Sequence, residues 1–61
     1  MRSKFIVRFK NEDREAVIEH YDGKYHVSVT GPNFKASFSN TLYALAESYA
    51  RDAIGLEVEY A

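Results

Sequence analysis

Two histidines are the side chains of this 61-residue chain best suited to proton transfer near neutral pH. His20 and His26 fall within one expected β-hairpin, whose turn is formed by Asp22 and Gly23. Strand alternation puts His20 on the apolar face of this hairpin and His26 on the other face, across from Glu19. The two histidines therefore cannot act together, and His26 with Glu19 is better explained as an ordinary cross-strand pair.

Two glutamates near the end of the chain have the spacing of paired carboxylates. Glu57 and Glu59 lie two residues apart on one face of an expected strand, and no further ligand or catalytic partner accompanies them. The chain has no cysteine and only three glycines, with no glycine-rich phosphate loop. A pocket large enough for catalysis is also difficult to build at this size. We therefore predict no enzymatic activity, no cofactor and no metal site.

Basic and aromatic side chains gather on the sheet face opposite the expected core. Tyr21 lies there among cations, as in sheets that stack nucleic-acid bases. However, this face has one aromatic side chain, beside the acidic Glu19, and the formal net charge is −1, so nucleic-acid binding is weakly supported. Ile6 and Val17 share this face, which favours contact with another protein. The nucleic-acid alternative would use Arg8, Lys10, Tyr21, Lys24 and His26.

Length and composition limit the architecture and the location. We assign residues 1–61 to one domain, and a chain this short buries only about 60% of its unfolded surface. Disulfides are excluded because cysteine is absent, which also fits a reducing compartment. The chain has no apolar run near the ~20 residues that a bilayer span requires, and its first residues do not form a signal peptide. We predict a cytoplasmic protein with no membrane partner.

Alternating hydrophobicity predicts the strands. Residues 4–10 form the first, and residues 15–30 form a hairpin in which paired positions sum to 45. Pro32 interrupts the pattern, and residues 34–38 resume it, either as a fourth strand or as a continuation of the third past a bulge. Residues 56–60 are the final strand. A sheet of this kind has at least one open edge, to which a partner or a second copy can add a strand.

The segment from Ser39 to Gly55 has the periodicity of an amphipathic helix. Ser39 or Asn40 can cap its N-terminus, and Gly55 suits the left-handed position that ends a helix. Glu47 and Arg51 lie one turn apart on its outer face. The side chains expected to face inward are Leu42, Leu45, Ala46, Tyr49, Ala50, Ala53 and Ile54. The element order β-β-β-(β)-α-β predicts an α+β two-layer sandwich, with an antiparallel-rich sheet of four or five strands and one helix on one face.

Parts of the chain resemble the N-terminal domain of HicB-like antitoxins. The resemblance covers residues 4–55 and includes a D/G hairpin, a proline-containing turn, a Thr-Leu helix start and an Ala-Arg-x-Ala-Ile helix end. It is carried by Asp22, Gly23, Tyr25, Pro32, Thr41, Leu42, Ala50, Arg51, Ala53 and Ile54. The chain departs from the family in lacking the Pro-Gly-Cys turn and the C-terminal DNA-binding helices, and in needing one extra residue inside the helix. The element order is also similar to that of the small phage inhibitor of bacterial RNA polymerase.

Both resemblances imply a non-enzymatic protein that occupies the surface of another protein, and neither supplies transferable binding residues. We predict an antitoxin-like or phage-type inhibitor that acts by protein–protein contact. The alternatives are a nucleic-acid-binding module and a self-assembling structural subunit such as a homodimer. The predicted contact residues are Ile6, Arg8, Val17, Glu19, Tyr21 and His26 on the sheet, with Tyr43, which falls outside the apolar stripe of the helix.

Overall fold

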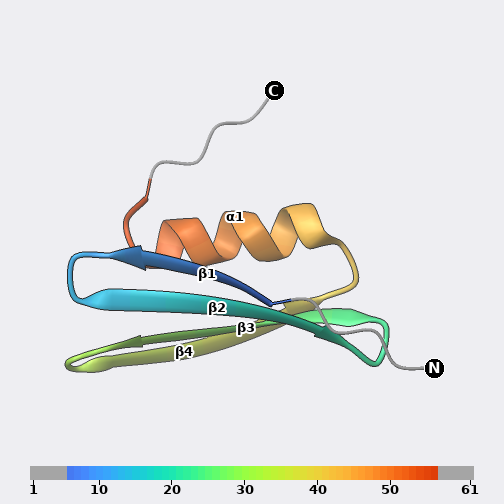
Figure 1. Ribbon diagram of the computed structural model, residues 1–61, viewed down its shortest axis with the longest axis horizontal. Coiled ribbons are helices and arrows are strands. Elements are labelled where there is room, and N and C mark those ends of the chain that lie inside the picture. Colours follow the sequence, from blue (N-terminus) through green and yellow to red (C-terminus); the bar gives the residue numbers. More distant parts are fainter. Residues whose placement is uncertain (1–5, 57–61) are drawn as a thin grey trace.

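Three two-residue turns determine the arrangement of the sheet. In the computed structural model, which describes residues 6–56, these turns recur every ten residues, at 12–13, 22–23 and 32–33. Each strand pairs antiparallel with the next, so the described strands form one open sheet of order β1-β2-β3-β4 (Figure 1). The strands are β1 (Ile6–Asn11), β2 (Arg14–Tyr21), β3 (Lys24–Gly31) and β4 (Phe34–Asn40).

The central hairpin has the predicted turn and register. Asp22 and Gly23 have φ angles of 54° and 72°, the left-handed values that a type I′ turn requires at both positions. A Cβ added to Gly23 would meet nothing within 4 Å, so its backbone angle, and not lack of space, favours glycine there. The turn pairs Tyr21 with Lys24, and the pairing continues along β2 and β3 as predicted.

Residues after Pro32 form a separate strand, which decides between the two predicted alternatives. β4 extends to Asn40 and is therefore two residues longer than the predicted segment 34–38. The helix consequently begins later than predicted, as α1 (Tyr43–Ala53). Leu42 occupies the N-cap position without a side-chain cap, while Asn40 Oδ1 accepts a hydrogen bond from the Leu42 N–H at 2.9 Å, before the helix starts. The predicted N-cap at Ser39 or Asn40 is wrong because both residues belong to β4.

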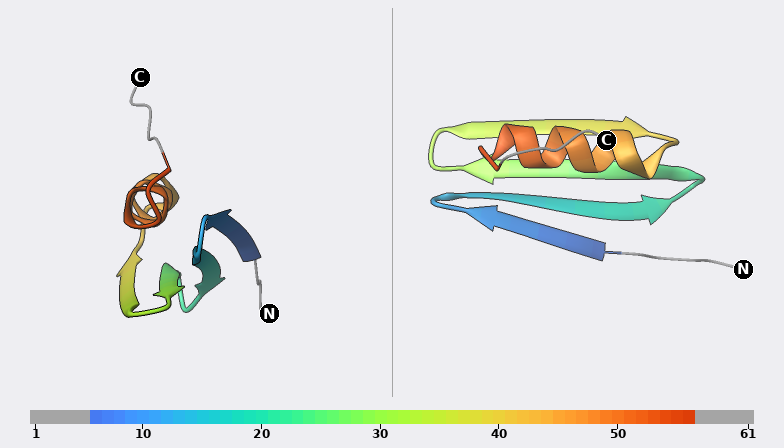
Figure 2. Two further views of the ribbon diagram at one scale, coloured as in Figure 1. Left: turned by 90° about the vertical axis from the view of Figure 1, so that its left-hand side faces the viewer. Right: turned by 90° about the horizontal axis from the view of Figure 1, so that it is seen from above.

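Helix α1 turns back from the end of β4 and lies along the sheet, over β3 and β4 in the view from above (Figure 2). It packs against β2, β3 and β4. The alanines of α1 allow its backbone to approach the sheet closely, since a methyl group is the smallest side chain that still buries apolar area. The buried core consists of Ala16, Ile18, Val27 and Val29 from the sheet and Ala46, Ala50 and Ile54 from the helix and its end.

The face that α1 turns toward the sheet differs from the prediction. Leu42 and Leu45 are 59% and 48% exposed, so their assignment to the inward stripe is wrong. Tyr43, predicted on the outer face, packs against the core and contacts the Tyr25 ring edge-on, with centroids 5.3 Å apart. The apolar residues of this helix span too wide an arc for all of them to meet one sheet. Because the helix packs closely on the sheet, the side of α1 that carries Ala46 and Ala50 faces inward. Leu42 and Leu45 then lie on one flank of the helix.

The helix ends as predicted at Gly55. Its φ of 88° lies in the left-handed region, the Leu56 N–H donates to the Arg51 carbonyl at 2.8 Å, and the Gly55 N–H donates to the Asp52 carbonyl at 3.2 Å. This pair of bonds is a Schellman motif. Leu56 packs against the core, and the rest of the predicted strand 56–60 lies outside the described residues. Among residues 6–56 there is no helix of the length and apolarity that crossing a bilayer requires.

Candidate interaction surface

One face of the sheet is not covered by α1, and we call it the open face. Side chains alternate along each strand, so the strand register assigns them to the two faces. Because the core residues of β2 and β3 point toward α1, their neighbours in sequence point away from it. The open face carries Ile6, Arg8, Lys10, Glu15, Val17, Glu19, Tyr21, Lys24, His26, Ser28, Thr30, Lys35, Ser37 and Ser39.

The six contact residues predicted on the sheet lie together on the open face. Opposed side chains on neighbouring strands have Cβ atoms about 4.5–5.5 Å apart, so the register shows which of them are adjacent. We call these six residues the contact patch. Its pairs are Ile6 with Glu19, Arg8 with Val17 and Glu19 with His26, and Tyr21 joins it by stacking on His26.

Tyr21 and His26 form a stacked pair within the contact patch. Their rings stack with centroids 3.9 Å apart and an angle of 15° between the planes. His26 Nε2 lies 3.2 Å from the Tyr21 carbonyl oxygen, which can only accept, so a proton on Nε2 completes a hydrogen bond there. These two contacts hold the rings in place before any partner arrives, which lowers the entropy lost on binding.

The contact patch exposes apolar surface on β1 and β2. Ile6 is 52% exposed and Tyr21 43% exposed, while Val17, which Glu19 separates from Tyr21 along β2, is partly buried. The β3 and β4 side of the open face carries small hydroxyl side chains instead. These are Ser28, Thr30, Ser37 and Ser39, all exposed. The apolar residues of the open face therefore lie on β1 and β2, among charged side chains, and its hydroxyl residues form a hydroxyl half on β3 and β4. The predicted contact residues did not include this division.

Acidic side chains on β2 interrupt the basic residues of the open face. Arg8 Nε lies 2.9 Å from Glu15 Oε2, so this arginine already has an anionic partner. Glu19 lies between Ile6 and His26 in the same row of the sheet. A nucleic-acid phosphate approaching this region would meet both carboxylates, which raises the electrostatic cost of binding.

The remaining predicted residues lie on the other side of the sheet. His20 stacks on Tyr25 with centroids 4.2 Å apart, on the face that α1 covers, so the prediction that the two histidines occupy opposite faces is confirmed. Tyr43 packs against the same Tyr25 ring and is separated from the contact patch by the sheet. Burial raises the pKa of Tyr43 above its ordinary value of 10, nearby Glu47 raises it further, and Arg51 opposes them.

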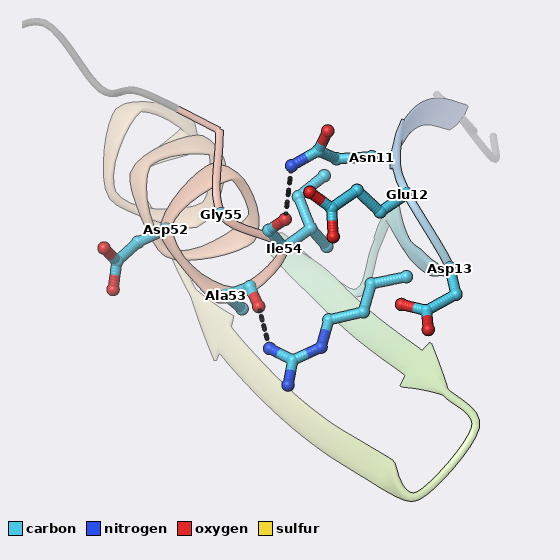
Figure 3. Close-up of a pocket in the computed structure, with 8 residues that line it drawn as sticks. Asn11, Glu12, Asp13, Asp52, Ala53, Ile54 and Gly55 are labelled. Atoms are coloured by element: carbon cyan, nitrogen blue, oxygen red, sulfur yellow. Dashed lines mark hydrogen bonds between the residues drawn. The ribbon is translucent and has the colours of Figure 1, made fainter.

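A hollow of about 340 Å³ lies between the β1–β2 turn and the end of α1 (Figure 3). Two side chains in it donate to carbonyls that a helix end leaves unpaired: Asn11 Nδ2 to Ile54 O at 2.8 Å, and Arg14 Nη1 to Ala53 O at 2.9 Å. Both donors are thus committed to holding α1 in place. The polar groups of this hollow therefore support the fold. The sequence did not predict these two hydrogen bonds, because their donor and acceptor residues lie 43 and 39 positions apart.

Ligand-forming groups are sparse in the described part of the chain. Within residues 6–56 no three or more His, Asp or Glu side chains come together as a metal site would require. The predicted carboxylate pair Glu57 and Glu59 lies outside these residues. Comparison of the chain with protein-family models, curated proteins and solved structures found no match. The two resemblances described above therefore stay predictions.

Proposed function

We propose that the chain is a small non-enzymatic module that binds another protein through the contact patch. The observation that carries this proposal is the exposure of Ile6 and Tyr21, which lie diagonally across β1 and β2 on the open face, next to Glu19. Large apolar side chains exposed together on a small domain mark interaction surfaces. Aromatic and arginine side chains are also enriched where binding energy is concentrated.

The charges around the contact patch suit recognition of a protein. Arg8 and Glu19 place both signs of charge among the apolar residues, Arg8 opposite Val17 and Glu19 between Ile6 and His26. Charges arranged in this way at an interface set orientation and discriminate against wrong partners more than they add affinity. The mixture of signs supports protein contact over nucleic-acid binding, for which the acidic residues would be unfavourable.

The resemblances identify two classes of partner to consider, a toxin-like protein and a bacterial RNA polymerase. In either case the module would mask a functional surface of its partner, in the cytoplasm. We further propose that the sheet and α1 form a two-layer α+β sandwich. Binding of such a partner protein would then depend on the contact patch of the sheet and not on α1.

Affinity capture with graded variants tests the contact patch. Tyr21→Ala is expected to weaken capture of the partner about thirtyfold, because truncation of an aromatic anchor at an interface costs about 2 kcal/mol or more. Ile6→Ala should weaken it less. Thr30→Ala is the matched control, since Thr30 is exposed on the hydroxyl half of the same face. Capture that is unchanged by Tyr21→Ala and Ile6→Ala would contradict the assignment of this surface.

A binding assay with mixed DNA and RNA tests the nucleic-acid alternative. A module that binds phosphates would show affinity that falls steeply with salt and decreases further in Lys24→Ala. The proposed function predicts no binding at low salt beyond a nonspecific background. Strong, salt-dependent binding that is lost with Lys24→Ala would replace protein contact by nucleic-acid contact on the same face.

A further inference from the structure

The outer edge of β4 has unpaired backbone groups. A two-residue turn makes Gly31 and Phe34 a hydrogen-bonded pair, and the bonded pairs then recur at every second residue. The backbone N–H and C=O groups of Lys35, Ser37 and Ser39 therefore point away from β3. No other strand pairs with this edge among residues 6–56. Such an edge is a template for a further strand.

Exposed apolar side chains on α1 lie on the same side of the molecule. Tyr49 stacks on Phe38 of β4, with ring centroids 4.6 Å apart, which places this flank of the helix above the β4 edge. Leu42, Leu45 and Tyr49 follow one another at spacings of three and then four residues, the pattern of a helix–helix seam. Both leucines are about half exposed. The β4 edge and this flank together form one surface, which we call the β4 side.

We propose that a second copy of this chain binds the β4 side, with the two β4 strands antiparallel about a two-fold axis at Ser37. An interface of this kind is isologous, because each copy presents the same surface to the other. It would join two four-stranded sheets into one of eight strands, with both helices on the same face. The helices would run antiparallel beside the axis, and Leu42 and Leu45 of each would be covered by the other.

Two copies of β4 present compatible side chains to each other in this register. Ser37 faces Ser37 of the partner subunit, and Lys35 faces Ser39 of the partner subunit, so no two like charges are opposed. On the helix face the large Phe38 lies beside the small Ala36 of the partner subunit. All three residues with outward backbone groups then form hydrogen bonds across the axis.

The opposite edge does not fit itself in the same way. Two-residue turns point the backbone groups of Ile6, Arg8 and Lys10 outward from β1. Self-pairing centred on Arg8 would place two arginines directly opposite each other, which is unfavourable. Charged residues are a common means of keeping edge strands from pairing. The charge pattern thus assigns the second copy to β4 and not to β1.

The size of the core supports self-association. Among residues 6–56, the large side chains buried to below 2% exposure are Ile18, Val27 and Val29. A chain of this size without disulfides or a metal commonly gains stability by oligomerising. The leucines of the β4 side would add apolar burial that the isolated subunit lacks.

Sedimentation analysis and hydrogen exchange on the wild-type chain test the proposal. The expected mass is twice the 7.0 kDa of one chain at high concentration, falling toward 7.0 kDa on dilution. The Ser37 and Ser39 amides should exchange slowly at high concentration and quickly after dilution. The outward amides of Arg8 and Lys10 provide an internal control and should exchange quickly at both concentrations.

Variants at the two edges sharpen the test. Ser37→Pro removes an outward N–H that β3 does not use, and it should halve the mass while the circular dichroism of the fold is retained. Lys10→Pro makes the same change on β1 and should leave the mass unchanged. Leu45→Glu changes the helix flank without touching a strand and should raise the dissociation constant about tenfold or more. Ala44→Glu, at an exposed position on another side of α1, is its control.

Three outcomes would overturn the proposal. The first is a chain that stays at 7.0 kDa at all concentrations. The second is a dimer whose mass responds to Lys10→Pro and not to Ser37→Pro or Leu45→Glu. The third is a monomer in which deletion of residues 57–61 exposes the Ser37 and Ser39 amides, since a segment of the same chain would then occupy the edge.

Discussion

The two edge strands of the sheet, β1 and β4, carry different side chains. Arg8 and Lys10 place cations along β1, whereas β4 presents Ser37 and Ser39 with only Lys35 as a charge. The two edges therefore differ in the electrostatic cost of accepting another strand. A small sheet can thus protect one of its edges with charged side chains and leave the other edge with less of that protection.

The two sides also differ in how they hold the helix. At the β1–β2 turn, side-chain hydrogen bonds from Asn11 and Arg14 reach the carbonyls at the end of α1. On the β4 side the contacts are aromatic, through the stack of Phe38 on Tyr49. We therefore expect substitutions that remove these hydrogen bonds to lower the free energy of unfolding more than substitutions that remove the aromatic stack.

The largest effect is expected at Arg14. Its guanidinium donates to the Ala53 carbonyl at 2.9 Å and lies 4.2 Å from the centre of the Phe34 ring. Arg14→Ala should lower the free energy of unfolding by about 2–3 kcal/mol, because it removes a hydrogen bond from a charged group and a cation–π contact. Urea denaturation measures this. Lys35→Ala at the exposed β4 edge is the control and should change stability by less than about 0.5 kcal/mol.

A smaller loss is expected at the glycine that ends the helix. Gly55→Ala should cost about 1–2 kcal/mol, because a φ of 88° strains any residue with a Cβ. The added Cβ would also lie 3.3 Å from Asn11 Nδ2, next to the bond that ties β1 to the helix. Asp52→Ala, at an exposed position nearby, should change stability by less than about 0.5 kcal/mol. Equal effects of the two changes in thermal denaturation would contradict this account.

On the β4 side the expected effect is about 1 kcal/mol. Tyr49→Leu keeps apolar volume but removes the stack on Phe38, which contributes about 0.5–1.5 kcal/mol beyond area burial. Denaturation at one low protein concentration separates this loss from any change in self-association. A double-mutant cycle with Phe38→Leu should recover the same coupling energy, and a coupling near zero would show that the rings pack independently.

The charge pair between β1 and β2 should contribute still less. Arg8 and Glu15 are separated by 2.9 Å but both side chains are more than a third exposed. Their coupling energy should be about 0.2–1 kcal/mol and should fall as salt is added. A double-mutant cycle with Arg8→Ala and Glu15→Ala, measured at low and high salt, checks both statements. A coupling that is independent of salt would show that the pair is less hydrated than its exposure indicates.

The smallest effect at neutral pH is expected for Tyr43→Phe, which lies between the two sides. Since folding raises the pKa of Tyr43, the folded chain keeps its proton to higher pH than the unfolded chain does. Stability from this group is complete below about pH 10, the unfolded value, and is lost as the pH rises through the folded pKa. Wild type should therefore lose stability above about pH 10 more steeply than Tyr43→Phe. Parallel pH profiles of unfolding would exclude this linkage.

Much of the sheet was predictable from local chemistry. The Asp22-Gly23 turn and the alternation on both sides of it gave the correct register, because a two-residue turn of this type leaves one pairing. The same alternation placed six predicted residues on the open face. Tyr43 was assigned to the wrong surface because periodicity does not show where the inward arc of a helix is centred.

Turn residues, alternation and a helix-ending glycine are local properties, and the sequence by itself determined the first strand, the β2–β3 hairpin with its antiparallel register, and the position of Gly55. The tertiary structure decided which flank of α1 meets the sheet. Ala46 and Ala50 are buried against the sheet, whereas Leu42 and Leu45 are exposed, because close packing of a helix on a sheet favours small side chains. It also decided that Asn11 and Arg14 meet the end of α1, since only folding brings residues about 40 positions apart into hydrogen-bonding distance.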